Sequence, residues 1–159
     1  MNQGIKKESQ ELLQKASSYC AKEEKCRLQV RQKLTFWGAT AEQAEDILQQ
    51  LADENYINEE RFAREFALGK FRNNKWGKIK IAIELSRFHI PEEYIRKGLD
   101  AIDTEEYISL LKKILLQRSR SLNETNREVA KKKLATFAMG KGFEGELVWR
   151  MVKEVVERR

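Results

Sequence analysis

The sequence predicts an all-α fold built from three tandem three-helix repeats that form an elongated, curved helical stack. Composition is the first reason, because the 159 residues include one proline and eight glycines, while Ala, Leu, Glu, Lys and Gln are abundant. Apolar spacing is the second reason, because apolar residues recur at the i, i+3 and i+4 positions of helix faces in three successive blocks. We expect the repeats to comprise residues 1–57, 58–103 and 104–159.

Six apolar positions recur across the three blocks with no gap, which is the third reason. The central set is Ile81, Leu85, Ile90, Ile95, Leu99 and Ile102. A shift of 51 residues toward the N-terminus gives Val30, Leu34, Ala39, Ala44, Leu48 and Leu51. A shift of 53 residues toward the C-terminus gives Leu134, Ala138, Phe143, Val148, Val152 and Val155. A period of this length is typical of stacked helical units.

The first block contains three predicted helices. An apolar stripe over residues 5–21 predicts the first, and a second stripe runs from Leu28 to Trp37. Gly38 follows it, and we expect this glycine in the left-handed conformation that ends many helices. Thr40 and Gln43 have the spacing of a capping box, so they predict the start of the third helix.

The central block begins with Asn58, a residue suited to cap a helix that then carries aromatic residues at helical spacing. A basic turn over residues 70–80 follows, and Pro91 begins the last helix. Residues 78–85 alternate apolar and polar side chains, which alone is typical of a strand. The repeat predicts a helix instead, and a helix buried on two sides would explain its additional isoleucines.

In the third block, residues 107–115 carry the apolar face of a first helix. Residues 118–125 are rich in Arg, Ser and Asn, and we expect them to form a flexible loop before the last two helices. Arg and Ser in such a loop suit phosphate or carboxylate binding, and they equally suit an ordinary connection between helices.

The net charge of +6 predicts an anionic partner, either nucleic acid or an acidic protein surface. The charge grows along the chain, since the three blocks carry −1, +2 and +5. Basic residues concentrate in residues 61–87 and 112–133, where ordinary solvated helix faces are the alternative interpretation. The residues that we expect at a partner or nucleic-acid contact are Arg61, Arg64, Arg72, Lys75, Lys78, Lys80, Arg118, Arg120, Lys131 and Lys132.

Nothing in the sequence predicts catalysis, a cofactor, a metal site or a small-molecule substrate. His89 is the one histidine and stands in no catalytic motif, so we expect it to be a helix-terminal residue with positive φ. Cys20 and Cys26 lack further metal ligands nearby and are expected to be reduced thiols in a cytoplasmic protein. No apolar run approaches the length needed to span a membrane, and the first residues do not resemble a signal peptide.

Residues 56–90 resemble the RecX family, whose members are bacterial modulators of the recombinase RecA. The resemblance lies in the opening Tyr56-Ile57-Asn58-Glu59, the later Trp-Gly pair, and an Ile-rich helix that ends Glu-Leu. The chain departs from the family at His89, where glycine is usual. The resemblance implies a three-repeat fold and a non-enzymatic regulator of DNA repair, homologous recombination and the SOS response. Such a regulator binds RecA and its single-stranded DNA filament and inhibits or modulates the recombinase, ATPase and co-protease activities.

Two other functions stay open from the residues alone. One is a stand-alone helical DNA-binding protein, acting on single- or double-stranded DNA with a short recognition helix. The other is a helical-repeat adaptor for another protein. A DNA-binding protein would show an affinity that falls steeply with salt concentration, whereas an adaptor would not require it.

Overall fold

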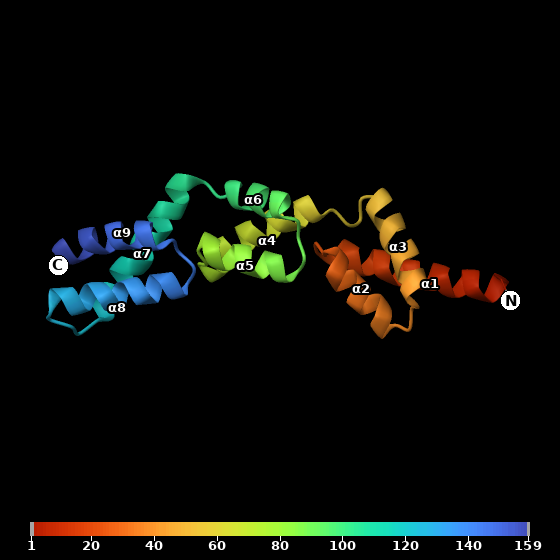
Figure 1. Ribbon diagram of the computed structural model, residues 1–159, viewed down its shortest axis with the longest axis horizontal. Coiled ribbons are helices and arrows are strands. Elements are labelled where there is room, and N and C mark those ends of the chain that lie inside the picture. The colour runs from red at the N-terminus through yellow and green to blue at the C-terminus, as the bar shows by residue number, and fades with distance from the viewer. Residues whose placement is uncertain (1, 159) are drawn as a thin grey trace.

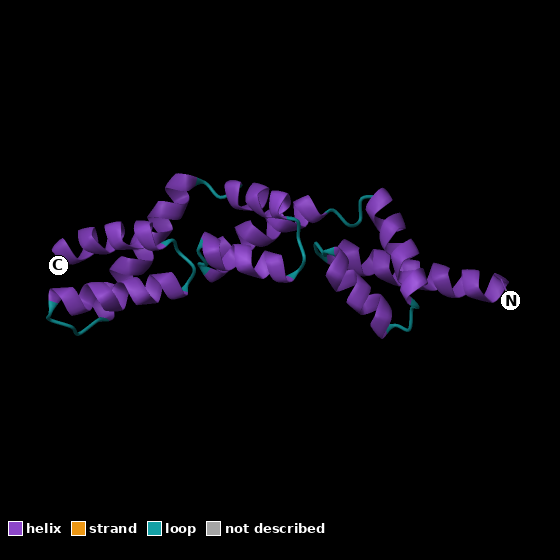
Figure 2. Cartoon of the chain, in the orientation of Figure 1, coloured by secondary structure: helices purple, strands orange, loops and turns teal. Residues whose placement is uncertain are grey.

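The computed structural model describes residues 2–158, with side chains at position 4 and from 6 to 158, and every regular element in that range is an α-helix (Figure 2). The helices are α1 (Asn2–Lys22), α2 (Arg27–Phe36), α3 (Ala41–Asp53), α4 (Glu59–Asn74), α5 (Lys78–Arg87), α6 (Glu92–Asp100), α7 (Thr104–Ser121), α8 (Arg127–Gly140) and α9 (Gly145–Glu157). The predicted all-α fold is confirmed. None of these helices is both long enough and apolar enough to cross a membrane.

The helices pack in consecutive groups of three along one long axis (Figure 1). Helices α1–α3 contact one another, as do α4–α6 and α7–α9, and the N- and C-terminal ends lie at opposite ends of the molecule. Three tandem three-helix repeats in an elongated stack are therefore present, as the sequence predicted. We call these groups repeat 1, repeat 2 and repeat 3. Their boundaries at residues 57/58 and 103/104 remain a prediction.

The recurring apolar positions form the cores of the repeats. Val30, Ile81 and Leu134 are equivalent in the repeat, and each is 0% exposed. Most other members of the three sets are also buried, but Ile95 and Leu99 in α6 are only half-buried. The central repeat thus departs from the other two at this pair of positions.

The predicted helix ends have the expected geometry. The Thr40 hydroxyl accepts the Gln43 backbone N–H, while the Gln43 side chain accepts the Thr40 N–H, which completes the capping box. The Asn58 side chain accepts the Arg61 backbone N–H at the start of α4. Gly38, with φ +92°, has the left-handed conformation expected of a residue that follows a helix.

Buried side chains form two separate cores. One belongs to repeat 1 and includes Leu34, Leu48 and Ile57. The other runs continuously through repeats 2 and 3, and Cys26 from repeat 1 is part of it. Repeats 2 and 3 therefore pack as a pair, and repeat 1 joins them mainly at the start of α2.

One expectation about α5 was wrong. The segment is a helix, but it is not buried on two sides, because Ile79 and Ile83 are 47% and 49% exposed. A helix turns by about 100° per residue, so both side chains lie roughly opposite the buried Ile81. Helix α5 packs on α4 and α6 through the face of Ile81 and Leu85 alone.

The expected loop at residues 118–125 was also wrong in its first half. Helix α7 continues through Ser121, and only residues 122–126 form the connection to α8. The cause is Ser119, which is buried and follows Leu111 and Leu115 at four-residue spacing. A small side chain at this position extends the buried stripe by one turn, so the helix continues past the point where the sequence becomes polar.

Candidate partner interface

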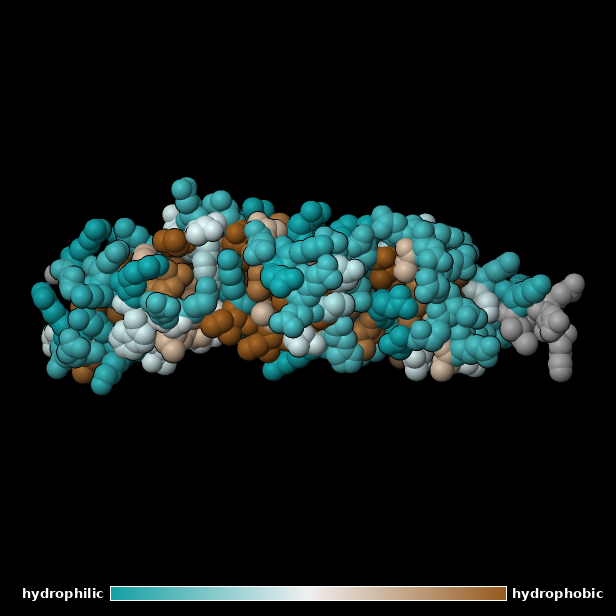
Figure 3. Space-filling model, turned by 45° about the horizontal axis from the view of Figure 1, so that its top comes forward, coloured by the Kyte–Doolittle hydropathy of each residue, from teal (hydrophilic) through white to brown (hydrophobic). Residues whose placement is uncertain are grey.

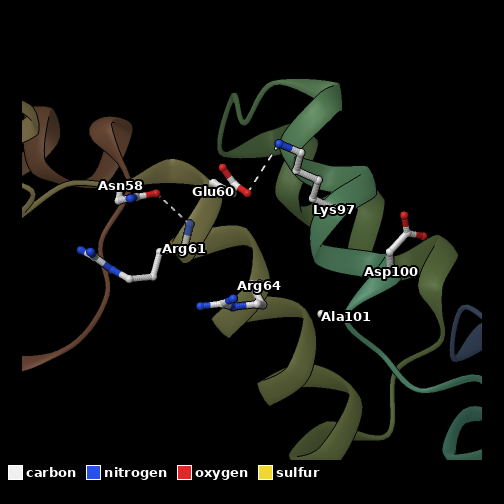
Figure 4. A pocket seen from close by; sticks show the side chains of 7 residues that line it. All are labelled: Asn58, Glu60, Arg61, Arg64, Lys97, Asp100 and Ala101. Carbon is white, nitrogen blue, oxygen red and sulfur yellow. Dashed lines mark hydrogen bonds and ion pairs between the residues drawn. The ribbon is translucent and has the colours of Figure 1, made fainter.

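The ten predicted contact residues lie on several surfaces. Arg61 and Arg64 of α4 line a pocket of about 480 Å³ together with Lys97 and Asp100 of α6 (Figure 4). The two arginine side chains point to the same side, away from Asp100. Arg61 forms an ion pair with Glu24 and donates to backbone carbonyls of the linker at residues 55 and 56. Arg61 therefore joins repeat 1 to repeat 2, whereas Arg64 is exposed.

Arg72 and Lys75 lie at the C-terminal end of α4. The Arg72 Nε atom is 3.4 Å from a carboxylate oxygen of Glu106 in α7, so this arginine links repeats 2 and 3. Lys75 has φ 58° and follows the helix as its left-handed cap residue, with the side chain exposed. Both residues are exposed, and Arg72 is the one held in an ion pair.

Lys78 and Lys80 lie over aromatic rings. The Nζ atom of Lys80 is 4.5 Å from the centre of a Trp76 ring, and Lys70 approaches the same side chain at 5.0 Å. Trp76 also packs edge-on against Phe66. The Nζ atom of Lys78 is 5.0 Å from the ring centre of Tyr107. Trp76 therefore packs within the repeat while its surroundings carry two cations.

Arg118 and Lys132 meet at a second pocket, of about 390 Å³, between α7 and α8. The guanidinium carbon of Arg118 lies 4.7 Å from the ring centre of Phe137, and Lys141 approaches that ring at 5.9 Å. Stacking on an aromatic ring holds a guanidinium in place and leaves N–H groups free to bind a phosphate or carboxylate. Among the predicted residues, this cluster combines a pocket with an arginine held against an aromatic ring.

The remaining two residues of the predicted set differ in their surroundings. Arg120 is exposed near the end of α7, whereas Lys131 is half-buried and forms an ion pair with Glu128 at 3.2 Å. At the Trp76 and Phe137 clusters, two further cations, Lys70 and Lys141, approach the rings and were absent from the predicted set. A sequence signal existed, because Phe66–Lys70 and Phe137–Lys141 each have the four-residue spacing that brings side chains together on a helix.

The junctions between repeats reuse one hydrogen-bonding arrangement. At the start of α2, the Arg27 backbone N–H donates to a Glu59 carboxylate oxygen at 3.3 Å, and burial raises the pKa of Glu59. At the start of α5, the equivalent Lys78 N–H donates to the Tyr107 hydroxyl at 2.9 Å. Tyr107 in turn donates to Glu144, and burial together with this hydrogen bond raises the pKa of the phenol.

Repeats 2 and 3 are also joined by hydrogen bonds between backbone groups. The N–H groups of Gly77 and Ile79 donate to the carbonyls of Lys141 and Gly142 at 2.8 and 2.9 Å. A side chain at Gly142 would place its Cβ 2.3 Å from the Cβ of Lys80, so the close approach requires glycine there. This contact fixes the basic start of α5 against the α8–α9 turn.

His89 and the two cysteines have the environments predicted for them. His89 is exposed with φ 59°, and both cysteines are free thiols buried in the structure. Burial raises the pKa of Cys20 to about 11 and also raises that of Cys26, so neither thiol is activated. Within the described part of the chain, no group of three or more His, Cys, Asp or Glu side chains is arranged to hold a metal ion.

Comparison with known proteins gives a consistent result. The family model described as RecX, second three-helix domain, matches residues 58–99, which is most of repeat 2. Regulatory protein RecX of Chlorobium limicola is 27% identical over 132 residues, covering 83% of this chain and 79% of the relative. The corresponding protein of Clostridium acetobutylicum is 26% identical over 145 residues, covering 89% and 67%. The chain is therefore similar to the RecX family, in repeat 2 by the family model and along most of its length by these relatives.

Solved RecX structures share the fold. The crystal structure of RecX from Lactobacillus salivarius superposes with a TM-score of 0.84 at 16% identity, covering 92% of this chain and 96% of that one. A second crystal structure, of regulatory protein RecX, gives a TM-score of 0.76 at 22% identity, covering 96% and 77%. The three-repeat architecture is therefore common to these RecX proteins, and the regulatory role named for the relatives gives the context for this one.

Proposed function

We propose that this protein is a non-enzymatic regulator that binds RecA and the RecA–single-stranded DNA filament in the cytoplasm. In this proposal it inhibits or modulates strand exchange, ATP hydrolysis and co-protease activity. The observation that carries the proposal is the similarity to RecX proteins together with an elongated three-repeat stack whose cations lie along repeats 2 and 3. Regulation of this kind requires occupancy of a surface and no chemistry by the bound protein.

The shape of the molecule supports contact with more than one filament subunit. Three repeats in a row present a long surface, whereas a compact domain would reach one subunit. Binding across subunits would stabilise one arrangement of them and oppose the rearrangements that accompany filament growth and hydrolysis. A long regulator in the filament groove would also exclude the duplex DNA or the protein substrate that must enter it.

We assign the predicted cations to two roles within this proposal. Arg61 and Arg72 join repeats, so their substitution is expected to alter the shape of the stack. Arg118 and Lys132 at the Phe137 pocket, with Lys80 beside Trp76, are placed to approach phosphates or acidic side chains of the partner. The other proposed contact residues are Arg64, Lys75, Lys78, Arg120 and Lys131.

The proposal is tested by measuring binding to the cognate RecA–single-stranded DNA filament and to the same DNA without RecA, over a series of salt concentrations. We expect tighter binding to the filament than to bare DNA at every salt concentration. Equal affinity for both would contradict the proposal, because RecA would then contribute nothing to recognition.

Stand-alone DNA binding is the second candidate, and the cation–aromatic clusters at Trp76 and Phe137 favour it. Single-stranded nucleic acid is bound by basic grooves with aromatic platforms. The salt series separates the two candidates, because phosphate contacts lower log K by about 0.7 per contact on single strands for each tenfold rise in salt. Tight, steeply salt-dependent binding to bare DNA that RecA does not improve would favour this second function.

A further inference from the structure

A valley with apolar side chains in its lining lies between α5 and α6 in repeat 2. It encloses about 700 Å³. The half-buried Ile95 and Leu99 of α6 line it, together with Ala82 of α5. The other lining residues are Lys78, Ser86, Ile90, Glu92, Arg96 and Asp100. We call this feature the α5–α6 valley.

Repeat 1 closes its equivalent valley with an ion pair. Ala82 and Arg96 correspond to Arg31 and Glu45 under the shift of 51 residues. Arg31 of α2 forms an ion pair with Glu45 of α3, and Arg27 approaches the same carboxylate at 4.0 Å. The apolar side chains beneath are Ala44 and Leu48, and both are buried.

Repeat 3 closes its valley by close packing. Val148 and Val152 correspond to Ile95 and Leu99, and both are 0% exposed. Ala135 of α8, the equivalent of Ala82, is also buried. The equivalent apolar positions are therefore buried in repeats 1 and 3, whereas in repeat 2 they are partly accessible.

The exposed apolar surface continues beyond the valley over α5. Ile79 lies about 60° around the helix from Ala82, and Ile83 lies about 100° from it. Both isoleucines are about half exposed, and neither is needed for the core. Figure 3 shows apolar surface between hydrophilic side chains in the middle of the molecule. Valley and outer face together form an apolar strip about as long as α6, roughly 13 Å for nine residues.

The rim of the valley identifies the chemistry of its occupant. Along α6 it carries Glu92, Arg96 and Asp100, and none of these forms an ion pair or side-chain hydrogen bond within residues 2–158. With Lys78 of α5, the lining carries two cations and two carboxylates around an apolar floor, so it lacks the net positive charge that attracts a phosphate backbone. An amphipathic helix fits, because its apolar stripe would cover Ile95 and Leu99 while a basic side chain faces Glu92 or Asp100.

We propose that the α5–α6 valley receives an amphipathic helix of a RecA subunit, with apolar residues one helical turn apart and a basic residue at their edge. This inference rests on the proposed function and adds the surface that recognises protein. The cations at the Phe137 pocket and near Trp76 remain available for other contacts. Recognition of protein and of DNA then occurs on different surfaces of the molecule.

The test introduces the Arg31–Glu45 ion pair of repeat 1 at the equivalent positions of repeat 2. In the double variant A82R/R96E, an arginine on α5 faces a glutamate on α6 at positions equivalent to Arg31 and Glu45. The helices keep their packing while the new side chains cover the valley. We expect the affinity for the RecA–single-stranded DNA filament to fall at least tenfold. The helical content and the melting temperature are expected to stay at or above those of the native protein.

Two control variants separate the effect of covering the valley from the effect of changing the charge of the protein. The variant R96E alone makes the rim more acidic but leaves the valley open, and its filament affinity is expected to stay within threefold of native. The variant A21R/R150E changes net charge by the same amount as A82R/R96E at exposed positions outside the valley, and it is also expected to bind normally. Unchanged filament binding by A82R/R96E would overturn the proposal.

A second substitution tests the outer rim without altering the core. Ile83→Glu introduces a charge at a side chain that is already half exposed, so the fold is expected to persist while filament affinity falls. Binding to bare single-stranded DNA is expected to be unchanged in both Ile83→Glu and A82R/R96E. Parallel loss of DNA and filament binding would overturn the proposal, because the valley would then act on nucleic acid. Failure of the native protein to bind the filament would instead contradict the proposed function.

Discussion

At the scale of single residues, three equivalent turns show how the backbone constrains the sequence. Gly38, His89 and Gly142 follow the second helix of repeats 1, 2 and 3, and all three have positive φ. Glycine adopts this conformation with little strain, and histidine adopts it more readily than most residues. Histidine at position 89 is therefore compatible with the turn, and the two equivalent turns of this chain carry glycine.

The two glycine turns differ in their surroundings, and this difference gives a prediction. A Cβ at Gly38 would meet nothing within 4 Å, whereas a Cβ at Gly142 would overlap Lys80. Gly38→Ala is expected to cost about 1 kcal/mol of unfolding free energy from backbone strain alone. Gly142→Ala is expected to cost about 1–3 kcal/mol more, because steric overlap adds to the strain. Urea denaturation measures both, and equal losses would contradict the close contact between repeats 2 and 3.

The junction carboxylate Glu59 predicts a pH dependence. Burial raises the pKa of Glu59 above its ordinary value of 4.5, so the folded state favours the protonated form. The stability that this group contributes is present below pH 4.5 and is lost as the pH rises through the higher folded-state pKa. Glu59→Gln keeps an oxygen acceptor for the Arg27 N–H and does not titrate. Relative to the native protein, this variant should therefore gain stability as the pH rises above 4.5.

Chemical denaturation in acid and near neutrality tests this expectation. A Glu59→Gln variant that loses stability relative to the native protein as the pH rises would show that the ionised carboxylate stabilises the junction. Glu60, its exposed neighbour on α4, supplies a control position at which the same substitution is expected to have little effect.

At the scale of elements, α5 shows what the sequence alone predicts and what it does not. The 51-residue period identified Ile81 and Leu85 as core and overrode the local strand pattern, because equivalent positions share one environment. The same period gave no information on Ile79 and Ile83, which lie outside the recurring set. Their exposure depends on which faces of α5 the other helices cover, and α4 and α6 cover the face of Ile81 and Leu85.

The sequence did not predict which cations lie together in the structure, and the reason is related. Local charge identified ten residues but not their orientation around each helix or their partners. Arg61 and Arg72 form ion pairs with residues more than thirty positions away, so sequence proximity does not predict those contacts. Arg118, by contrast, was assigned to a loop and yet forms part of a defined pocket, because the buried Ser119 extends α7.

The two faces of α5 give a matched prediction. Leu85→Asp places a carboxylate in the core of repeats 2 and 3 without a partner, and the expected loss is about 3–5 kcal/mol of unfolding free energy. Ile83→Asp places the same group on the exposed face, and the expected loss is within about 1 kcal/mol. Thermal melting followed by circular dichroism distinguishes the two. Similar losses would show that the assigned orientation of α5 is wrong.

At the scale of the whole molecule, the elongated stack has two cores and a charge gradient. Repeats 2 and 3 share one core and hold the excess positive charge, whereas repeat 1 has its own core and a net charge of −1 over residues 1–57. The paired Glu24 and Arg61 connect the two parts across the linker. This arrangement suits a regulator in which repeats 2 and 3 carry the basic contacts and repeat 1 extends the surface along a filament.

The most direct test of this account is ATP hydrolysis by the cognate RecA on single-stranded DNA with the protein titrated in. We predict that hydrolysis falls at protein concentrations well below that of RecA, since one long molecule would contact several subunits or block filament growth. Hydrolysis that stays unchanged at concentrations equal to RecA, under conditions where the protein binds bare DNA tightly, would contradict regulation of RecA and favour the stand-alone DNA-binding function.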